Sequence, residues 1–166
     1  MQLLMMTPSS HPKTFFAMKL AARVGEVVMM RLKRQWNRPR PTQYCPALYP
    51  PVAVPGHAAY PAGHALIATL TAELLKEITV GPSATPSPYA KSLDELAKAI
   101  GRNRVIAGLH FWSDIEWGKH AGKKTYEFLK DMTVPTAPPP PPAGQAKAVF
   151  TFKDIFEAAQ KEWFTT

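Results

Sequence analysis

Three short motifs of basic residues and histidines carry most of the chemistry that this sequence can offer. They have the arrangement Lys-x6-Arg-Pro, Pro-Ala-Gly-His and Arg-x5-His-x3-Asp. Their charged and titratable members are three cations, two imidazoles and one carboxylate: Lys33, Arg40, Arg104, His64, His110 and Asp114. Cations hold the oxygens of a phosphate-like anion, and an imidazole can act as a nucleophile towards it. The set therefore predicts a site for phosphoryl transfer or for vanadate.

The first motif also has a simpler interpretation. Lys33 and Arg40 belong to a basic run over residues 31–40. Such a run is typical of a solvated surface or a nucleic-acid patch. Trp36, which lies within the run, could stack on a base.

The second motif predicts the start of a helix that faces an anion. Gly63 would let an anion approach the first amides of the helix, which point towards it. His64 at the helix start can reach the same place. Taken alone, a histidine in this position is more often a structural cap or an exposed residue.

The third motif predicts a histidine oriented by a carboxylate. Arg104 and His110 flank a turn at Gly108 and can therefore converge. Asp114 can accept the proton of one ring nitrogen of His110, which leaves the other nitrogen free as a nucleophile. A single His/Asp pair of this kind is often an ordinary cap interaction. The three motifs together are harder to explain in that way, because their chemistry is complementary.

The elements that must position these residues are helices, since alternation typical of strands is scarce. Helical spacing predicts helices over about residues 14–36, 64–78, 92–104, 113–130 and 152–164. Capping boxes are predicted at residues 92–95, 113–116 and 151–154. The predicted apolar stripe of the first helix consists of Phe15, Met18, Ala22, Val27 and Met30. That of the second helix consists of Leu66, Ile67, Leu70, Leu74 and Ile78. The predicted fold is an all-α helical bundle, with a proline-rich loop over residues 43–61.

The chain divides into three parts by composition. Residues 1–133 are predicted to form the helical domain. Residues 134–149 are predicted to be a proline-rich linker, with a polyproline II spacer over residues 138–142. Residues 150–166 form a C-terminal helix with an apolar face, which can dock on the same chain or on a second copy to give a homo-oligomer.

Charge and cysteine content narrow the function. The 20 Lys and Arg against 12 Asp and Glu give a net charge of +8, which favours anionic partners. The single cysteine excludes an internal disulfide and a multi-cysteine metal site. The apolar stretches are too short for a membrane span, and the start of the chain is a poor signal peptide. A soluble, cytoplasmic protein is expected, with a periplasmic location left open.

In this order and spacing, the motifs KRQWNRPRP, PAGH and NRVIAGLHFWSD resemble the three signatures of the type 2 phosphatidic acid phosphatase superfamily. That superfamily also contains the bacterial non-specific acid phosphatases and the vanadium-dependent haloperoxidases. The flanking segments AYPAGHA and RVIAGLHFWSDIEWG are similar to the soluble bacterial members. The resemblance covers about residues 25–125 and implies their helical-bundle fold.

The resemblance also implies a role for each residue of the motifs. The groups that would hold the oxygens of phosphate or vanadate are Lys33, Arg40, Arg104 and the backbone amide of Gly63. His110 would attack phosphorus to form a phosphohistidine, with Asp114 orienting it, and His64 would protonate the leaving oxygen and then activate water. A phosphatase of this kind needs no cofactor and no metal cation. In a haloperoxidase, His110 would instead be the axial ligand of vanadate.

Two positions depart from the signatures. Ala62 stands in place of the usual Ser and removes a hydroxyl donor, and loss of one such donor typically costs about 10²–10³ in turnover. Asn103 replaces the Ser before Arg104. The leading hypothesis is a phosphomonoesterase acting on a small anionic substrate. The alternatives are a vanadium haloperoxidase and a non-catalytic oxyanion-binding module, while nucleic-acid binding is not expected.

Overall fold

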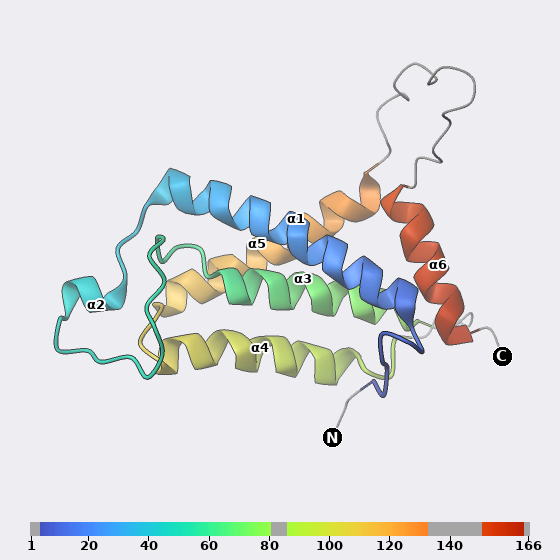
Figure 1. Ribbon diagram of the computed structural model, residues 1–166, viewed down its shortest axis with the longest axis horizontal. Helices are drawn as coiled ribbons and strands as arrows, with labels where there is room; N and C mark the ends of the chain where they lie inside the picture. Colours follow the sequence, from blue (N-terminus) through green and yellow to red (C-terminus); the bar gives the residue numbers. More distant parts are fainter. Residues whose placement is uncertain (1–3, 81–85, 133–150, 165–166) are drawn as a thin grey trace, which may run out of the picture.

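The computed structural model describes residues 4–80, 86–132 and 151–164. Its elements are α1 (Pro12–Trp36), α2 (Pro41–Tyr44), α3 (Gly63–Ile78), α4 (Ala90–Ile106), α5 (Trp112–Asp131) and α6 (Phe152–Phe164) (Figure 1). No strand is present over these three ranges, and the predicted all-α fold is confirmed. The predicted polyproline segment, residues 138–142, lies outside the described residues.

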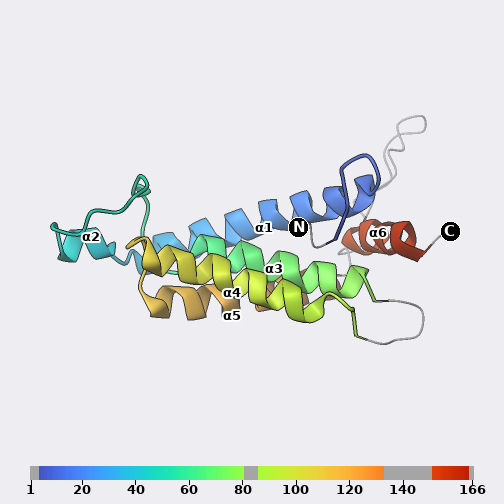
Figure 2. The same ribbon diagram turned by 90° about the horizontal axis from the view of Figure 1, so that it is seen from below.

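Helix α3 is the centre of the bundle. It contacts α1, α4, α5 and α6, and in both views it lies between α1 and α4 (Figure 1, Figure 2). Its sequence explains this position, because apolar residues recur every three or four positions and give it a broad apolar face. Leu66, Leu70, Leu74 and Ile78 are completely buried, which confirms most of the stripe predicted for this helix.

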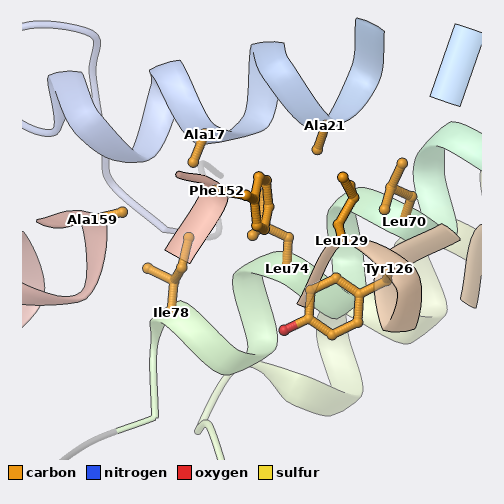
Figure 3. Packing of buried hydrophobic residues seen from close by; sticks show 9 residues of the cluster. All are labelled: Ala17, Ala21, Leu70, Leu74, Ile78, Tyr126, Leu129, Phe152 and Ala159. Atoms are coloured by element: carbon orange, nitrogen blue, oxygen red, sulfur yellow. The ribbon is translucent and has the colours of Figure 1, made fainter. Parts of the chain in front are cut away.

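The main hydrophobic core forms where α1, α3, α5 and α6 meet. Figure 3 shows nine of its side chains, which come from all four helices: Ala17, Ala21, Leu70, Leu74, Ile78, Tyr126, Leu129, Phe152 and Ala159. Complete burial of a large apolar side chain contributes about 1.5–3 kcal/mol. This core therefore fixes one end of the bundle. At the opposite end, α1 and α4 finish where α3 and α5 begin (Figure 1).

The buried face of α1 is made of small residues, and the stripe predicted for it is wrong in part. The residues of α1 that face the bundle include Thr14, Ala17, Ala21 and Gly25. Val27 is 69% exposed and Met30 47%. A Cβ atom at Gly25 would lie only 3.1 Å from a methyl group of Leu70. Close approach of α1 to α3 therefore selects small residues, and it turns the larger ones outwards.

Helix α6 packs on its own chain and stabilises two helix ends. The carboxylate of Glu162 accepts hydrogen bonds from the backbone N–H groups of Lys13 and Thr14 at 2.7 and 2.9 Å. These amides lie in the first turn of α1, where no acidic residue of α1 itself is present. The side-chain amide of Gln160 donates to the carbonyl of Glu77 near the end of α3. Of the two docking possibilities predicted for this helix, the structure therefore shows the one on the same chain.

The predicted helix starts agree with the structure at one capping box and differ at two. Thr151 and Asp154 form the predicted box, since each side chain accepts a hydrogen bond from the other residue's backbone N–H. Helix α4 instead begins at Ala90, before Ser92, and α5 begins at Trp112, before Ser113. In α5 the carboxylate of Asp114 accepts the N–H of Phe111 at 2.9 Å. This contact makes Phe111 the N-cap of α5, two residues before Ser113 of the predicted box.

The short helix α2 was not predicted, because its five-proline surroundings favour a loop. Pro41 occupies its first position, where a missing N–H costs nothing. The side chain of Gln43 accepts the N–H of Arg40 at 2.7 Å. The helix therefore holds the backbone of Arg40 in a fixed place. Among the helices of the described ranges, none is both long and apolar enough to cross a membrane.

Candidate active site

His110 and Asp114 form a buried pair at the junction of α4 and α5. The turn between the two helices depends on Gly108, which has a φ of +71° and lies in the left-handed region. His110 follows two residues later and is 5% exposed, while Asp114 is completely buried. The Nδ1 atom of His110 lies 3.2 Å from Oδ2 of Asp114. The orienting contact predicted from the four-residue spacing is therefore present.

The hydrogen bonds of His110 define its tautomer. Nη1 of Arg40 lies 3.0 Å from Nε2 of His110. A guanidinium can only donate, so Nε2 must accept and its lone pair points towards the cation. The ring proton therefore lies on Nδ1 and is donated to Asp114. This is the tautomer in which Nε2 can act as a nucleophile.

Burial lowers the pKa of His110 below its ordinary value of 6.5. The hydrogen bond to Asp114 acts in the opposite direction, and the positive charges of Arg40 and Lys33 lower the pKa further. The net result favours the neutral imidazole. Neutral imidazole is the form required for attack on phosphorus.

Asp114 accepts hydrogen bonds on both carboxylate oxygens. Oδ2 accepts from His110 and from the N–H of Phe111. Oδ1 accepts from Nη1 of Arg38 at 2.8 Å. Burial alone would raise the pKa of Asp114, but these hydrogen bonds and the charge of Arg38 lower it below its ordinary value. Asp114 therefore stays ionised and keeps the ring proton of His110 in place.

Lys33 and Arg40 are buried, and both bind the segment before α3. Lys33 is 2% exposed, and its Nζ donates to the carbonyls of Ala58 and Ala59 at 2.7 and 3.0 Å. Arg40 is 3% exposed and donates to the carbonyls of Leu109 and His57. These positions remove both cations from the surface, so the basic run of residues 31–40 does not act as one exposed patch. Burial and the nearby charge of Arg40 lower the pKa of Lys33 to about 8.

The start of α3 lies against the start of α5. The backbone N–H of Ala62 donates to the carbonyl of Asp114 at 2.9 Å. Gly63 follows as the first residue of α3, and a Cβ atom there would lie 2.0 Å from the sulfur of Met29. A larger residue at this position would therefore require the Met29 side chain to move. The methyl group of Ala62 is buried against Ala65 and Ile115.

His64 and Arg104 complete the polar end of the site. His64 is exposed, and its pKa is lowered by partial burial and by the charges of Arg104 and Arg40. Arg104 lies in the last turn of α4. Its Nε is buried and has no hydrogen-bond partner among the described residues. A buried donor of this kind is costly unless it is paired, so an acceptor that binds there would gain a hydrogen bond.

A cavity of about 800 Å³ joins these groups to an apolar wall. Its polar end is lined by Arg40, His57, Gly63, His64, Arg104 and His110. The rest is lined mostly by apolar side chains of α1, α3 and α4, and by residues 4–6 of the N-terminal segment. Five of the seven site residues predicted from the sequence thus line one cavity. Lys33 and Asp114 do not line it; Asp114 contacts His110, and Lys33 binds the carbonyls of Ala58 and Ala59.

Two residues of the site were not predicted. Arg38 binds Asp114, and its position two residues before Arg40 in the first motif was the available signal. His57 lines the cavity, and its Nδ1 lies 3.1 Å from Nη2 of Arg40. Its place in a proline-rich loop offers no comparable signal. Within the described residues, His, Cys, Asp and Glu do not form a group of three that could hold a metal ion.

Comparison with known proteins gives a partial match. No protein-family model matches the chain. The chain is 34% identical over 79 residues to a non-specific acid phosphatase of Salmonella typhimurium (strain LT2). The matched segment is 48% of this chain and 28% of that protein, so the chain spans less than a third of its relative's length. This similarity is consistent with a phosphatase superfamily, in agreement with the resemblance carried by the three motifs.

Proposed function

We propose that this protein is a phosphatase-like hydrolase that cleaves phosphomonoesters through a phosphohistidine at His110. The observation that carries the proposal is that His110, which is paired with Asp114, lines one cavity together with His64 and two arginines. An oxyanion can accept hydrogen bonds from the guanidinium groups of these arginines, and their positive charges favour it electrostatically. The similarity to an acid phosphatase supports the same reaction class.

The proposed reaction has two steps, and atoms balance in each. In the first, Nε2 of His110 forms a bond to phosphorus while the bond from phosphorus to the ester oxygen breaks. His64 gives its proton to the departing oxygen, and the alcohol leaves. In the second, neutral His64 takes a proton from water as the water oxygen attacks phosphorus. The bond between phosphorus and Nε2 then breaks, and phosphate leaves.

The cations stabilise the charge that develops on the oxygens in both steps. Arg40 and Arg104 line the cavity, and the amide of Gly63 at the start of α3 adds a backbone donor. Lys33 does not line the cavity. It contributes its positive charge, and it fixes the carbonyls of Ala58 and Ala59 by hydrogen bonds. Preset charges of this kind supply a large share of the rate in enzymes of this class.

The test is phosphate release from an aryl phosphate. We expect turnover that vanadate inhibits and that falls by about 10⁴-fold or more in His110→Ala. Acid-quenched and base-quenched samples are compared for a protein-bound phosphate, because phosphohistidine survives base and not acid. Activity that persists in His110→Ala would exclude the proposed nucleophile.

The same preparation separates the alternatives. Bromide oxidation with peroxide and added vanadate is measured in parallel, since the cations that would hold phosphate oxygens would also hold those of vanadate. Phosphate binding measured by calorimetry without any turnover would indicate an oxyanion-binding module instead of an enzyme.

A further inference from the structure

Arg38 has no role in the proposed reaction, yet it makes a set of specific contacts at the start of α5. Its Nη1 donates to Oδ1 of Asp114 at 2.8 Å and to the hydroxyl of Ser113 at 2.6 Å. Its guanidinium carbon lies 4.4 Å from the centroid of the Phe111 ring, within the range of a cation–π interaction. The side chain is 34% exposed. Arg38 does not line the main cavity and therefore cannot hold the substrate there.

The contacts of Arg38 extend those of the His/Asp pair. From one end to the other, Arg38 binds Oδ1 of Asp114, Oδ2 of Asp114 binds Nδ1 of His110, and Nε2 of His110 binds Arg40. Arg38 and Arg40, which are two residues apart in the sequence, therefore bind opposite ends of the His/Asp pair. Residues 37–40 are neither helix nor strand, and Arg40 has extended backbone. In an extended chain, side chains two residues apart lie on the same side.

We infer that Arg38 is a positioning residue. It fixes the ring orientation of His110 through the carboxylate of Asp114, and its positive charge reduces the stabilisation of protonated His110 by that carboxylate. The inference deepens the proposed function, and only its kinetic test rests on that function.

The physical reason is the burial of Asp114. Its side chain is completely buried, so each oxygen needs a donor from the protein. Through Nη1, Arg38 supplies both a donor and a positive charge to Oδ1, and this hydrogen bond restricts the orientation of the carboxylate. Without Arg38, the full negative charge would act on His110. The imidazolium would then be favoured, and the nucleophilic form would be present over a narrower pH range.

Other charged groups around the pair stay in place when Arg38 is changed. His110 also experiences the charges of Arg40 and Lys33. Asp114 interacts through space with Lys33, Arg40 and Tyr60. Because all three remain in an Arg38 variant, a change in the titration of His110 belongs to Arg38.

The experiment is a ¹⁵N NMR titration of the histidine ring nitrogens in the full chain. The signals of His110 are assigned by their loss in His110→Gln. We expect the pKa of His110 to rise by about one pH unit in Arg38→Met, since a unit charge a few ångströms away has an effect of this order. Arg34→Met removes the same charge from an exposed position at the end of α1 and is expected to leave the titration unchanged.

Two further variants separate charge from geometry. Arg38→Lys keeps the charge and is expected to return the pKa of His110 most of the way to the wild-type value. Arg38→Gln keeps a donor for Oδ1 without the charge and should resemble Arg38→Met. These two variants carry the test if Arg38→Met does not fold. Titration of His110 at the wild-type pKa in both Arg38→Gln and Arg38→Met, or an equal shift in Arg34→Met, would overturn the inference.

The kinetic readout is the pH dependence of kcat/KM. Its acid limb is expected to move to higher pH in Arg38→Met by the same amount as the NMR titration. If the wild-type protein releases no phosphate, the proposed function fails, while the NMR titration still decides the role of Arg38. If phosphate is released and the titration does not change, the inference fails and the proposed function stands.

Discussion

The two flanks of α3 are built in opposite ways. Against α5, the helices approach so closely that a Cβ atom at Gly122 would lie 2.5 Å from the carbonyl oxygen of Leu66, and one at Gly118 2.6 Å from that of Ala62. Between α1 and α4, the same helix borders a cavity of about 800 Å³ through Ile67 and Thr71. The closed flank fixes the start of α3 against Asp114, and the open flank leaves space for a ligand. The site lies where the two flanks meet.

The two flanks differ in which side chains have hydrogen-bonding groups left for a ligand. Beside the contact between α3 and α5, His110 and Asp114 have hydrogen-bond partners on both ring nitrogens and both carboxylate oxygens. On the open flank, Arg104 has a buried donor without a described partner, and His64 is exposed. Orientation and binding are therefore divided between the two flanks.

After His110, the largest effect is expected for Arg104, whose Nε has no hydrogen-bond partner among the described residues. Arg104→Met should lower kcat/KM for an aryl phosphate by about 10²–10³-fold, as loss of a charged donor to an oxyanion typically does. Phosphate binding by calorimetry should weaken in parallel. Arg102→Met is the control, because Arg102 is an exposed arginine on the same helix and should retain full activity. Equal losses in the two variants would mean that net charge, and no specific contact, governs binding.

The pH dependence of kcat/KM compares the two histidines directly. Burial and nearby cations lower the pKa of His110 and of His64 below 6.5. In the proposed mechanism His110 must be neutral and His64 protonated, so activity rises through the first pKa and falls through the second. Both limbs are therefore expected below pH 6.5, with about a tenfold loss per pH unit on the alkaline side.

A matched variant assigns the alkaline limb. His64→Asn should remove the loss of activity below pH 6.5 along with most of the turnover, because the proposed acid is then absent. A later loss is expected near pH 8, where Lys33 loses its proton. An activity maximum near pH 8 in the wild-type protein would show that His64 is not the acid.

The smallest effect is expected for the close contact between α3 and α5. In Gly118→Ala, the new methyl group would meet the carbonyl of Ala62, a backbone atom that cannot move aside. The gain in helix propensity is about 1 kcal/mol, and the cost of the clash is about 1–3 kcal/mol, so a modest net loss of stability is expected. Displacement of α5 from α3 should also lower turnover by about tenfold.

Gly56→Ala is the control for that variant, since nothing lies within 4 Å of a Cβ atom at Gly56. Urea unfolding and phosphate release are measured for both. If Gly118→Ala matches the wild-type protein in both measurements, the close contact between α3 and α5 does not position the site.

Local patterns predicted much of the fold and the central pair of the site. The stripe of α3 and the four-residue spacing of His110 and Asp114 are properties of short segments, and both are found. The stripe of α1 failed because its buried face depends on how closely α3 approaches it. The exposure of Val27 and Met30 is a property of that helix pair and not of either sequence alone.

The contacts that could not be predicted from the sequence join segments that are far apart along the chain. Arg38 reaches Asp114 across 76 positions of the chain, and Lys33 reaches the carbonyl of Ala59 across 26. The partner of Lys33 is a backbone carbonyl, which has no sequence signature at all. The predicted role of Lys33 as a ligand to the anion stays a prediction, because its ammonium group donates to the backbone carbonyls of Ala58 and Ala59.

The two-residue spacing of Arg38 and Arg40 constrains the length of the chain as well as its composition. Arg40 has extended backbone, and Arg38 precedes a proline, which favours extended backbone there. Because side chains alternate from side to side along an extended chain, inserting or deleting one residue at Pro39 would turn one of the two guanidinium groups away from the His/Asp pair. By contrast, residues 51–53 of the proline-rich loop are exposed. Changes in chain length should therefore be tolerated near Val52 and excluded between Arg38 and Arg40, even where every side chain of the site is retained.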